Sequence, residues 1–143
     1  MALHAWHIMK EKISIAPETS AQDVALRLMS SGMPALPVVN DRQEVMGMAT
    51  EHAVLSAIQQ GMDLEKVVAS AIMVKTPIIA DVNTSPDDLA KLILKHNCCA
   101  VITIVKDGKY VGIVSRSMLL DIFTSPHYSR FASKERKGPF VCL

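Results

Sequence analysis

The chain has 143 residues, half of them apolar, so it can form one compact domain or two half-domains that share a core. Lys and Arg number 15 against 14 Asp and Glu, a balance unlike that of a surface built to neutralise nucleic acid. No apolar stretch reaches the ~20 residues of a membrane helix, and the first residues lack the pattern of a secretory signal. The three cysteines, two of them adjacent, make a poor disulfide framework. We therefore expect a cytoplasmic protein with no membrane partner, and nucleic acid is disfavoured.

The sequence repeats itself at a displacement of about 65 residues. The segment Thr19-Ser20-x-x-Asp23 corresponds to Thr84-Ser85-x-x-Asp88, and the apolar pattern agrees along both copies. Further aligned pairs are Ala35 with Ala100, Gly47 with Gly112, and Leu55 with Leu120. The pairs Ile8-Met9 and Ile72-Met73 align one residue out of step, so a residue has been gained or lost near the first strand of each copy. Because one copy alone would bury too little surface, we expect two copies packed through their sheets with pseudo-twofold symmetry.

Each copy predicts a short strand, a helix, two strands and a second helix. The first helix begins after Ser20 or Ser85, since a serine before acidic residues is typical of a helix N-cap. Gly32 and Asn97 suit the left-handed conformation that ends a helix. β-rich segments around polar turns then predict hairpins with strands at 35–39 and 45–50, and at 100–105 and 110–115. The closing helices are expected at about 51–60 and 116–124.

The predicted organisation is a first unit at residues 1–63, a second unit at 64–124 and a tail at 125–143. Residues 61–68 have a partly helical pattern and form the connector. The tail has four basic residues against one acidic residue and contains Pro126 and Pro139, so we expect it to be loosely ordered. A short charge run of this kind is usually a solvated terminus, although an acidic partner is the alternative.

Corresponding segments of the two copies share a pattern with a known family. The first copy has Trp6-His7-Ile8-Met9, Met33-Pro34-Ala35-Leu36-Pro37-Val38-Val39-Asn40-Asp41 and Val45-Met46-Gly47-Met48-Ala49-Thr50, and the second has Ala71-Ile72-Met73-x-x-Thr76-Pro77-Ile78-Ile79 and Tyr110-Val111-Gly112-Ile113-Val114-Ser115-Arg116. These segments resemble the CBS domain, named for cystathionine β-synthase. The resemblance implies an α/β tandem pair, or Bateman module, in a small stand-alone protein. It also implies a regulatory role rather than catalysis, with two clefts for adenine nucleotides and a homodimeric assembly.

The residues themselves indicate how such a cleft can hold an anion. Each copy has a hydroxyl residue, Thr50 or Ser115, where the last strand meets the closing helix. A helix N-terminus carries unpaired N–H groups and partial positive charge, so phosphate can bind there. Gly47 and Gly112, three residues earlier, allow close approach of backbone or ligand. The alternative is that the glycines only permit tight strand packing and the hydroxyls only cap helices.

The candidate ligand-binding residues form two sets, of which we favour the second. The second cleft comprises Thr76, Pro77, Ile78, Cys99, Ala100, Val101, Ser115, Arg116 and Met118. The weaker first cleft comprises Ile13, Pro34, Ala35, Leu36, Thr50, His52 and Ala53. Arg116 beside Ser115 can pair with a phosphate, whereas Glu51 at the corresponding place in the first copy would repel an anion.

Both copies depart from the family's ligand-binding pattern at one position. The family has an Asp three residues after the hydroxyl, where it bonds a ribose, and this chain has Ala53 and Met118. Such a hydrogen bond is worth about 1.5–3 kcal/mol, so ribose recognition is in question at both clefts. We predict a sensor that requires no cofactor, binds an adenosine-containing ligand (AMP, ADP, ATP, S-adenosylmethionine or NADH) and signals to a partner protein. The alternative is a ligand-free dimerisation or assembly module.

The remaining reactive residues form no catalytic or metal-binding pattern. The five histidines have no paired spacing with carboxylates or a nucleophile, so no catalytic residue is predicted. Cys98 and Cys99 follow His96 closely, but neighbours on a predicted strand point to opposite faces and would not share a metal ion. We expect no metal site and unreactive thiols. Oxidation of a cleft-lining Cys99 that blocks a ligand remains the other hypothesis.

Overall fold

A computed structural model describes residues 3–11, 13–96 and 100–126 of the chain. In the first half the elements are α1 (Ala5–Ile8), β1 (Lys10–Glu11), α2 (Ala21–Ser31), β2 (Ala35–Val39), β3 (Val45–Thr50) and α3 (Glu51–Gln59). In the second half they are α4 (Ala69–Ile72), β4 (Ile79–Asp81), α5 (Pro86–Lys95), β5 (Val101–Lys106), β6 (Lys109–Ser115) and α6 (Arg116–Thr124). The predicted fold class, an α/β pair of similar units, is confirmed.

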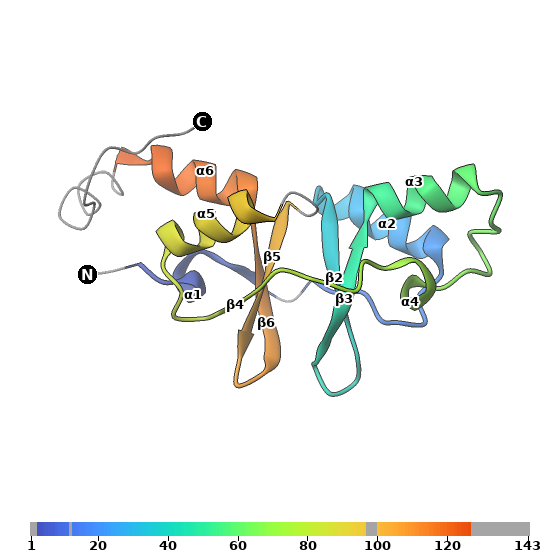
Figure 1. The fold of residues 1–143 in the computed structure, drawn as a ribbon, viewed down its shortest axis with the longest axis horizontal. Coiled ribbons are helices and arrows are strands. Elements are labelled where there is room, and N and C mark those ends of the chain that lie inside the picture. The colour runs from blue at the N-terminus through green and yellow to red at the C-terminus, as the bar shows by residue number, and fades with distance from the viewer. Residues whose placement is uncertain (1–2, 12, 97–99, 127–143) are drawn as a thin grey trace.

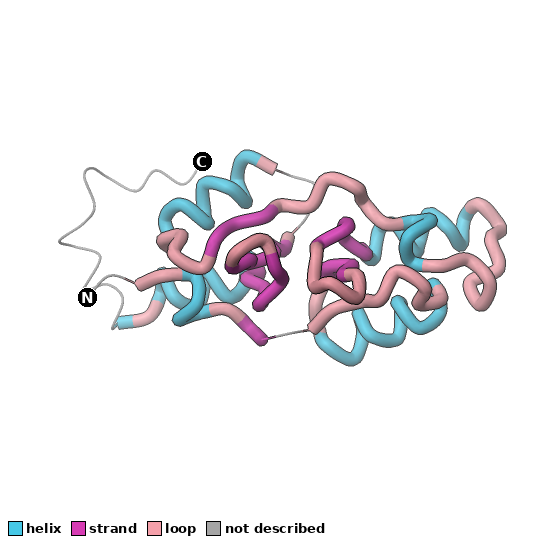
Figure 2. The backbone as a smooth tube through the Cα atoms, turned by 90° about the horizontal axis from the view of Figure 1, so that it is seen from below, coloured by secondary structure: helices cyan, strands magenta, loops and turns pink. Residues whose placement is uncertain are grey.

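The two units stand side by side with their hairpins in the middle and their long helices on the flanks (Figure 1). One sheet has the order β1-β6-β5-β4 and the other contains β2 and β3. Seen from below, the strands of both sheets lie in the middle and the helices surround them (Figure 2). The buried apolar residues form one core that runs through both units. At its centre, Thr103 Oγ1 of β5 lies 3.3 Å from Met48 Sδ of β3.

The first helix of each unit begins where the sequence predicts. Ser20 Oγ accepts a hydrogen bond from the backbone N–H of Asp23, and Ser85 Oγ accepts one from Asp88, both at 3.2 Å. Gly32 follows α2 in the left-handed region with φ 69°, as expected for a helix C-cap. The corresponding Asn97 lies outside the described residues.

The hairpin registers correct the alignment of the two copies by one residue. Ala35 pairs with Thr50, and Val101 pairs with Ser115. Ala35 therefore corresponds to Val101, and the prediction that it corresponds to Ala100 is wrong. The reason is that the connection from α5 to β5 is longer than the one from α2 to β2, which moves the second hairpin's first strand to Val101–Lys106.

The N-terminal segment of the chain belongs spatially to the second unit. Strand β1 pairs antiparallel with β6, with Lys10 opposite Ile113. The backbone N–H of Ala5 donates a 2.8 Å hydrogen bond to Thr84 O, which fixes α1 on the loop before α5. The pair Ile8-Met9 lies at the end of this short helix and directly before β1, near a strand as expected. Because these partners are far apart in sequence, no local pattern indicated the pairing.

The segment around α4, from the second half of the chain, packs in turn on the first unit. The two units thus exchange short segments, and we call this the reciprocal exchange. Val74 and Met48 exchange two backbone hydrogen bonds of 2.8 Å, so this segment adds to the edge of β3 in the first unit. The backbone N–H of Ala69 also donates to Thr19 O at 2.7 Å. Residues 61–68, expected to be partly helical, form turns instead. The contacts of residues 64–74 thus cross the predicted boundary at residue 63, and that division stays a prediction.

Candidate functional site

A cavity of about 410 Å³ lies between the two units, and we call it the seam cavity. Its lining residues are Pro34, Ala100, Ser115, Arg116, Ser117 and Leu120. Pro34 comes from the first unit, just before β2, whereas the other five come from the second unit. The volume falls within the range of about 300–1,000 Å³ that small-molecule sites occupy. A ligand in this cavity would touch both units.

Ser115 occupies the junction between β6 and α6 and caps the helix. Its Oγ accepts a hydrogen bond from the backbone N–H of Met118 at 3.2 Å and lies 3.0 Å from Ser117 Oγ. The backbone N–H of Ser115 in turn donates to Met118 Sδ at 3.4 Å. Thr50 caps α3 in the same way, accepting from the N–H of Ala53 at 3.0 Å. Both hydroxyls therefore already have a structural role as helix caps.

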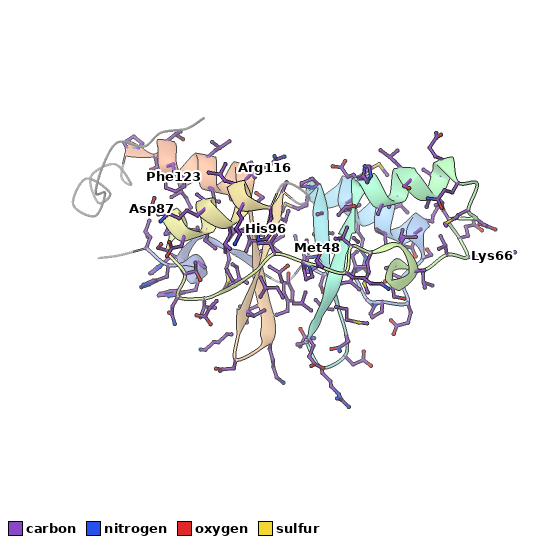
Figure 3. The ribbon with its side chains drawn as sticks, viewed as in Figure 1. Met48, Lys66, Asp87, His96, Arg116 and Phe123 are labelled. Carbon is purple, nitrogen blue, oxygen red and sulfur yellow. The ribbon has the colours of Figure 1, made fainter. Side chains whose placement is uncertain are left out.

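Arg116 supplies the positive charge of the seam cavity. It is the first residue of α6, its side chain is exposed, and Figure 3 shows it at the start of that helix. Its backbone N–H donates to Ala100 O at 3.0 Å, as the N–H of Glu51 does to Pro34 O at 3.1 Å in the first unit. No acidic side chain is among the lining residues, and Arg116 makes no ion pair within the described part of the chain. The two units are therefore alike in backbone but opposite in charge at this position.

The seam cavity contains three residues of the set predicted for the second cleft. They are Ala100, Ser115 and Arg116. Thr76, Pro77, Ile78, Val101 and Met118 are not among the lining residues. Ile78 and Val101 are buried, and the carbonyl of Ile78 accepts a 2.8 Å hydrogen bond from the N–H of Thr103. Cys99 lies outside the described residues.

Of the set predicted for the first cleft, Pro34 alone lines the seam cavity. Ala35, Leu36 and Thr50 are buried, Ile13 and Ala53 are half-buried, and His52 is exposed. Sequence reasoning missed Ser117 and Leu120, which line the cavity from the first turns of α6. Helical spacing from Arg116 would have found Leu120, since residues four apart share a helix face.

Gly47 and Gly112 lie where the exchanged segments cross the hairpins. A Cβ on Gly112 would stand 2.7 Å from Met9 Sδ and 2.9 Å from the carbonyl oxygen of Lys10. A Cβ on Gly47 would stand 2.9 Å from Met73 Sδ. The structure thus gives both glycines the role of permitting close packing between the units.

Within residues 3–11, 13–96 and 100–126, no three His, Cys, Asp or Glu side chains are grouped so that they could hold a metal ion. The helices there are all too short or too polar to cross a membrane.

The repeat, the reciprocal exchange and the cavity between the units define a paired α/β module with a cleft at its pseudo-twofold seam. The CBS domain model matches residues 5–60 and residues 68–125. The chain therefore belongs to the CBS domain family, and its two matches form a tandem CBS pair. The resemblance noted in the sequence is confirmed.

Two curated relatives are each 24% identical to the chain over the aligned residues. An uncharacterised protein from Methanopyrus kandleri is 24% identical over 114 residues, which cover 79% of this chain and 58% of the relative. Inosine-5'-monophosphate dehydrogenase from Korarchaeum cryptofilum is 24% identical over 131 residues, which cover 92% of this chain and 25% of the enzyme. This chain thus spans less than two thirds of either relative.

Solved structures of similar length share the fold. An uncharacterised conserved protein from Pyrococcus horikoshii is 27% identical, with a TM-score of 0.71 and coverage of 97% of this chain and 98% of that one. A CBS domain protein from Pyrobaculum aerophilum, solved in complex with AMP, is 16% identical, with a TM-score of 0.76 and coverage of 92% and 99%. Some proteins with this fold have therefore been solved with AMP bound.

Proposed function

We propose that this chain is a regulatory module that binds an adenosine-containing nucleotide or related ligand in the seam cavity and signals to a partner protein. The observation that carries the proposal is a cavity lined from both units, whose lining includes Arg116, a residue with no ion pair to any described residue. A ligand that touches both units binds one arrangement of them more tightly than another. It thereby shifts the population of arrangements that a partner protein meets.

The first turn of α6 supports binding of a phosphate group. The N–H groups of Arg116 and Met118 already have acceptors, so the N–H of Ser117 between them is the first-turn donor that remains for an anion. The Ser117 hydroxyl and the Arg116 guanidinium belong to the same first turn and add donors. Glu51 gives the corresponding turn of α3 the opposite charge, so we place the ligand in the seam cavity beside Arg116.

The rest of the cavity suits a planar base. Pro34 and Leu120 provide apolar lining, and Ala100 has a small side chain that takes up little of the space. Met118 and Ala53 cannot bond a ribose as an Asp would, so affinity depends on the phosphate and the base. AMP, ADP, ATP and NADH fit this description, and S-adenosylmethionine would offer its carboxylate in place of a phosphate.

Thermal unfolding of the full chain with these ligands and cyclic dinucleotides tests the proposal. A ligand at ~100 times its Kd stabilises the fold by about 2.7 kcal/mol, which raises Tm by roughly 5–10 °C in a chain of this size. Arg116→Gln should remove most of the rise, whereas the matched variant Glu51→Gln should keep it. If no ligand in the panel raises Tm, the sensor proposal fails.

The second candidate is an assembly module that needs no ligand. One observation favours it: large apolar side chains project from the long helices, with exposed fractions of 69% for Met29, 62% for Leu55, 66% for Leu94 and 65% for Leu120. A homodimer that covers these helices would remove that apolar surface from water. We propose a homodimer under either function, because Met29, Leu55 and Leu94 lie outside the lining of the seam cavity.

A further inference from the structure

A second cavity, of about 370 Å³, lies at the end of the β5–β6 hairpin that is remote from the seam cavity. We call it the hairpin cavity. It is lined by Trp6, Met9, Val82, Asn83, Lys106 and Val111. These residues come from α1 and its C-cap, from the loop after β4 and from the turn end of the hairpin. Ser115 and Lys106 lie at opposite ends of the hairpin, ~16 Å apart along a strand of this length.

The aromatic wall of the hairpin cavity is held in place by the backbone. The N–H of Trp6 donates to Val82 O at 3.2 Å, and the neighbouring N–H of Ala5 donates to Thr84 O at 2.8 Å. The indole nevertheless remains 52% exposed, and its ring stacks against that of His7 at 3.7 Å between centroids. A half-exposed indole on an anchored backbone offers a flat surface on which another ring can stack.

One lysine, Lys106, lines the hairpin cavity, and a second lies opposite it on the hairpin. Lys106 lies directly opposite Lys109 in the β5–β6 register, and both side chains are exposed. Like charges directly opposite each other on a hairpin are destabilising, and neither lysine makes an ion pair with any described residue. An anion bound there would offset this repulsion.

The acidic side chains near the hairpin cavity do not neutralise these lysines through an ion pair within the described residues. No carboxylate is among the lining residues. Asp81, at the end of β4, accepts a 2.9 Å hydrogen bond from the backbone N–H of Asn83. Asp107 sits in the hairpin turn, where its φ of 52° and that of Gly108 at 77° fit a tight two-residue turn. The exposed Lys106 ammonium and the Asn83 side-chain amide are therefore the polar groups that line the cavity.

We propose that the hairpin cavity binds a small planar aromatic molecule that carries a carboxylate or a phosphate. The ring stacks on Trp6 and covers the apolar side chains of Met9, Val82 and Val111. The anionic group lies against Lys106 and accepts a hydrogen bond from the Asn83 amide. This site is separate from the seam cavity and does not depend on a nucleotide binding there.

Trp6 is the single tryptophan of the chain, so its indole N–H gives one peak in a two-dimensional nitrogen–proton NMR spectrum. The full chain is titrated with benzoate and with phenyl phosphate, which distinguish a carboxylate from a phosphate. Benzyl alcohol serves as a ring without charge, and acetate and inorganic phosphate serve as anions without a ring. At least one aromatic anion should shift the peak saturably, with a Kd on the order of 1 mM, and the comparison compounds should bind at least about fivefold more weakly.

Matched variants assign the effect to the cavity. Lys106→Gln should weaken binding of the aromatic anion about 3- to 10-fold, and Lys109→Gln by a smaller factor. Lys66→Gln, which removes another exposed lysine at the far end of the molecule, should have no effect (Figure 3). Arg116→Gln in the seam cavity should also leave this titration unchanged, so its outcome is independent of the proposed nucleotide site.

Three results would overturn the proposal. The first is an indole peak that does not saturate with either aromatic anion. The second is equal binding by Lys106→Gln and the unchanged chain, given that both have the same Tm. The third is loss of the shift in Arg116→Gln, which would place the ligand in the seam cavity instead.

Discussion

The phenolic hydroxyl of Tyr110 donates a 2.7 Å hydrogen bond to the carbonyl oxygen of Ile13. The backbone N–H of Tyr110 donates to Gln43 O at 2.8 Å, in the turn of the other hairpin. One residue of the second unit thus binds two separate segments of the first. The side chain is 2% exposed, and its burial raises the pKa of Tyr110 to about 12.

Replacing Tyr110 with Phe should lower the free energy of unfolding by about 1 kcal/mol. The ring stays in the core, but the carbonyl of Ile13 loses its hydrogen-bond donor. Urea unfolding at neutral pH measures the change. An unchanged urea midpoint would mean that water replaces the hydroxyl without loss.

The raised pKa of Tyr110 also predicts a decline of stability in alkali. An unfolded phenol ionises near pH 10, whereas the folded one holds its proton to about 12, so the unfolded state releases its proton first. The contribution is therefore fully present below about pH 10 and is lost as the pH rises toward about 12, by at most about 2–3 kcal/mol. Urea midpoints at about pH 9 and about pH 11 should fall more in the unchanged chain than in Tyr110→Phe. Parallel falls would contradict the assignment.

Adding one methyl group at Gly47 or Gly112, where the exchanged segments cross the hairpins, should lower the free energy of unfolding. In Gly112→Ala the new Cβ meets Met9 Sδ and the Lys10 carbonyl, and in Gly47→Ala it meets the carbonyl of Val74. Because a backbone carbonyl cannot move aside cheaply, each change should cost about 1–3 kcal/mol. Gly61→Asn is the control, since nothing lies within 4 Å of its Cβ and Asn tolerates a positive φ. Thermal unfolding compares the three variants.

The parts of the fold that the sequence predicts are those set by local chemistry. Ser20 and Ser85 cap their helices, and the strand at 45–50 appears at the expected residues, because caps and alternating patterns act within a few positions. The pairing of Lys10 with Ile113 was not predictable in this way. It depends on two segments that are about a hundred residues apart, and neither carries a local signal for the other.

In the candidate site, too, the sequence predicts the local features but not the contacts between distant segments. The Ser115-Arg116 junction follows from a strand that ends in a hydroxyl residue and a helix that begins there. The sequence analysis assigned Pro34 to the first cleft, because it grouped residues by the unit they belong to. The seam cavity instead combines Pro34 with residues of the second unit. Trp6 and Lys106 share a cavity for a further reason, the exchange of α1 onto the second unit.

Removing the two capping hydroxyls should separate their structural role from a role in binding. Ser115→Ala and Thr50→Ala should each lower the free energy of unfolding by about 1 kcal/mol, since both hydroxyls accept a first-turn N–H. Ser115→Ala should weaken phosphate-bearing ligands more, because that hydroxyl lines the seam cavity. Calorimetric titration of both variants with a phosphate-bearing ligand measures the two losses of affinity. Equal losses of affinity would refute the preference for this cavity.

The exposed apolar helix faces predict that the chain pairs with itself. Leu55 and Leu94 are 62% and 66% exposed, and each contributes about 1.5–3 kcal/mol when fully buried. Leu55→Glu combined with Leu94→Glu should therefore convert a dimer to the 15.6 kDa monomer in sedimentation, with little change in the stability of the monomer because both positions are exposed. Met62→Glu, at an exposed loop position outside these helices, should leave the dimer intact. A monomeric unchanged chain would contradict the prediction that these faces pair with each other.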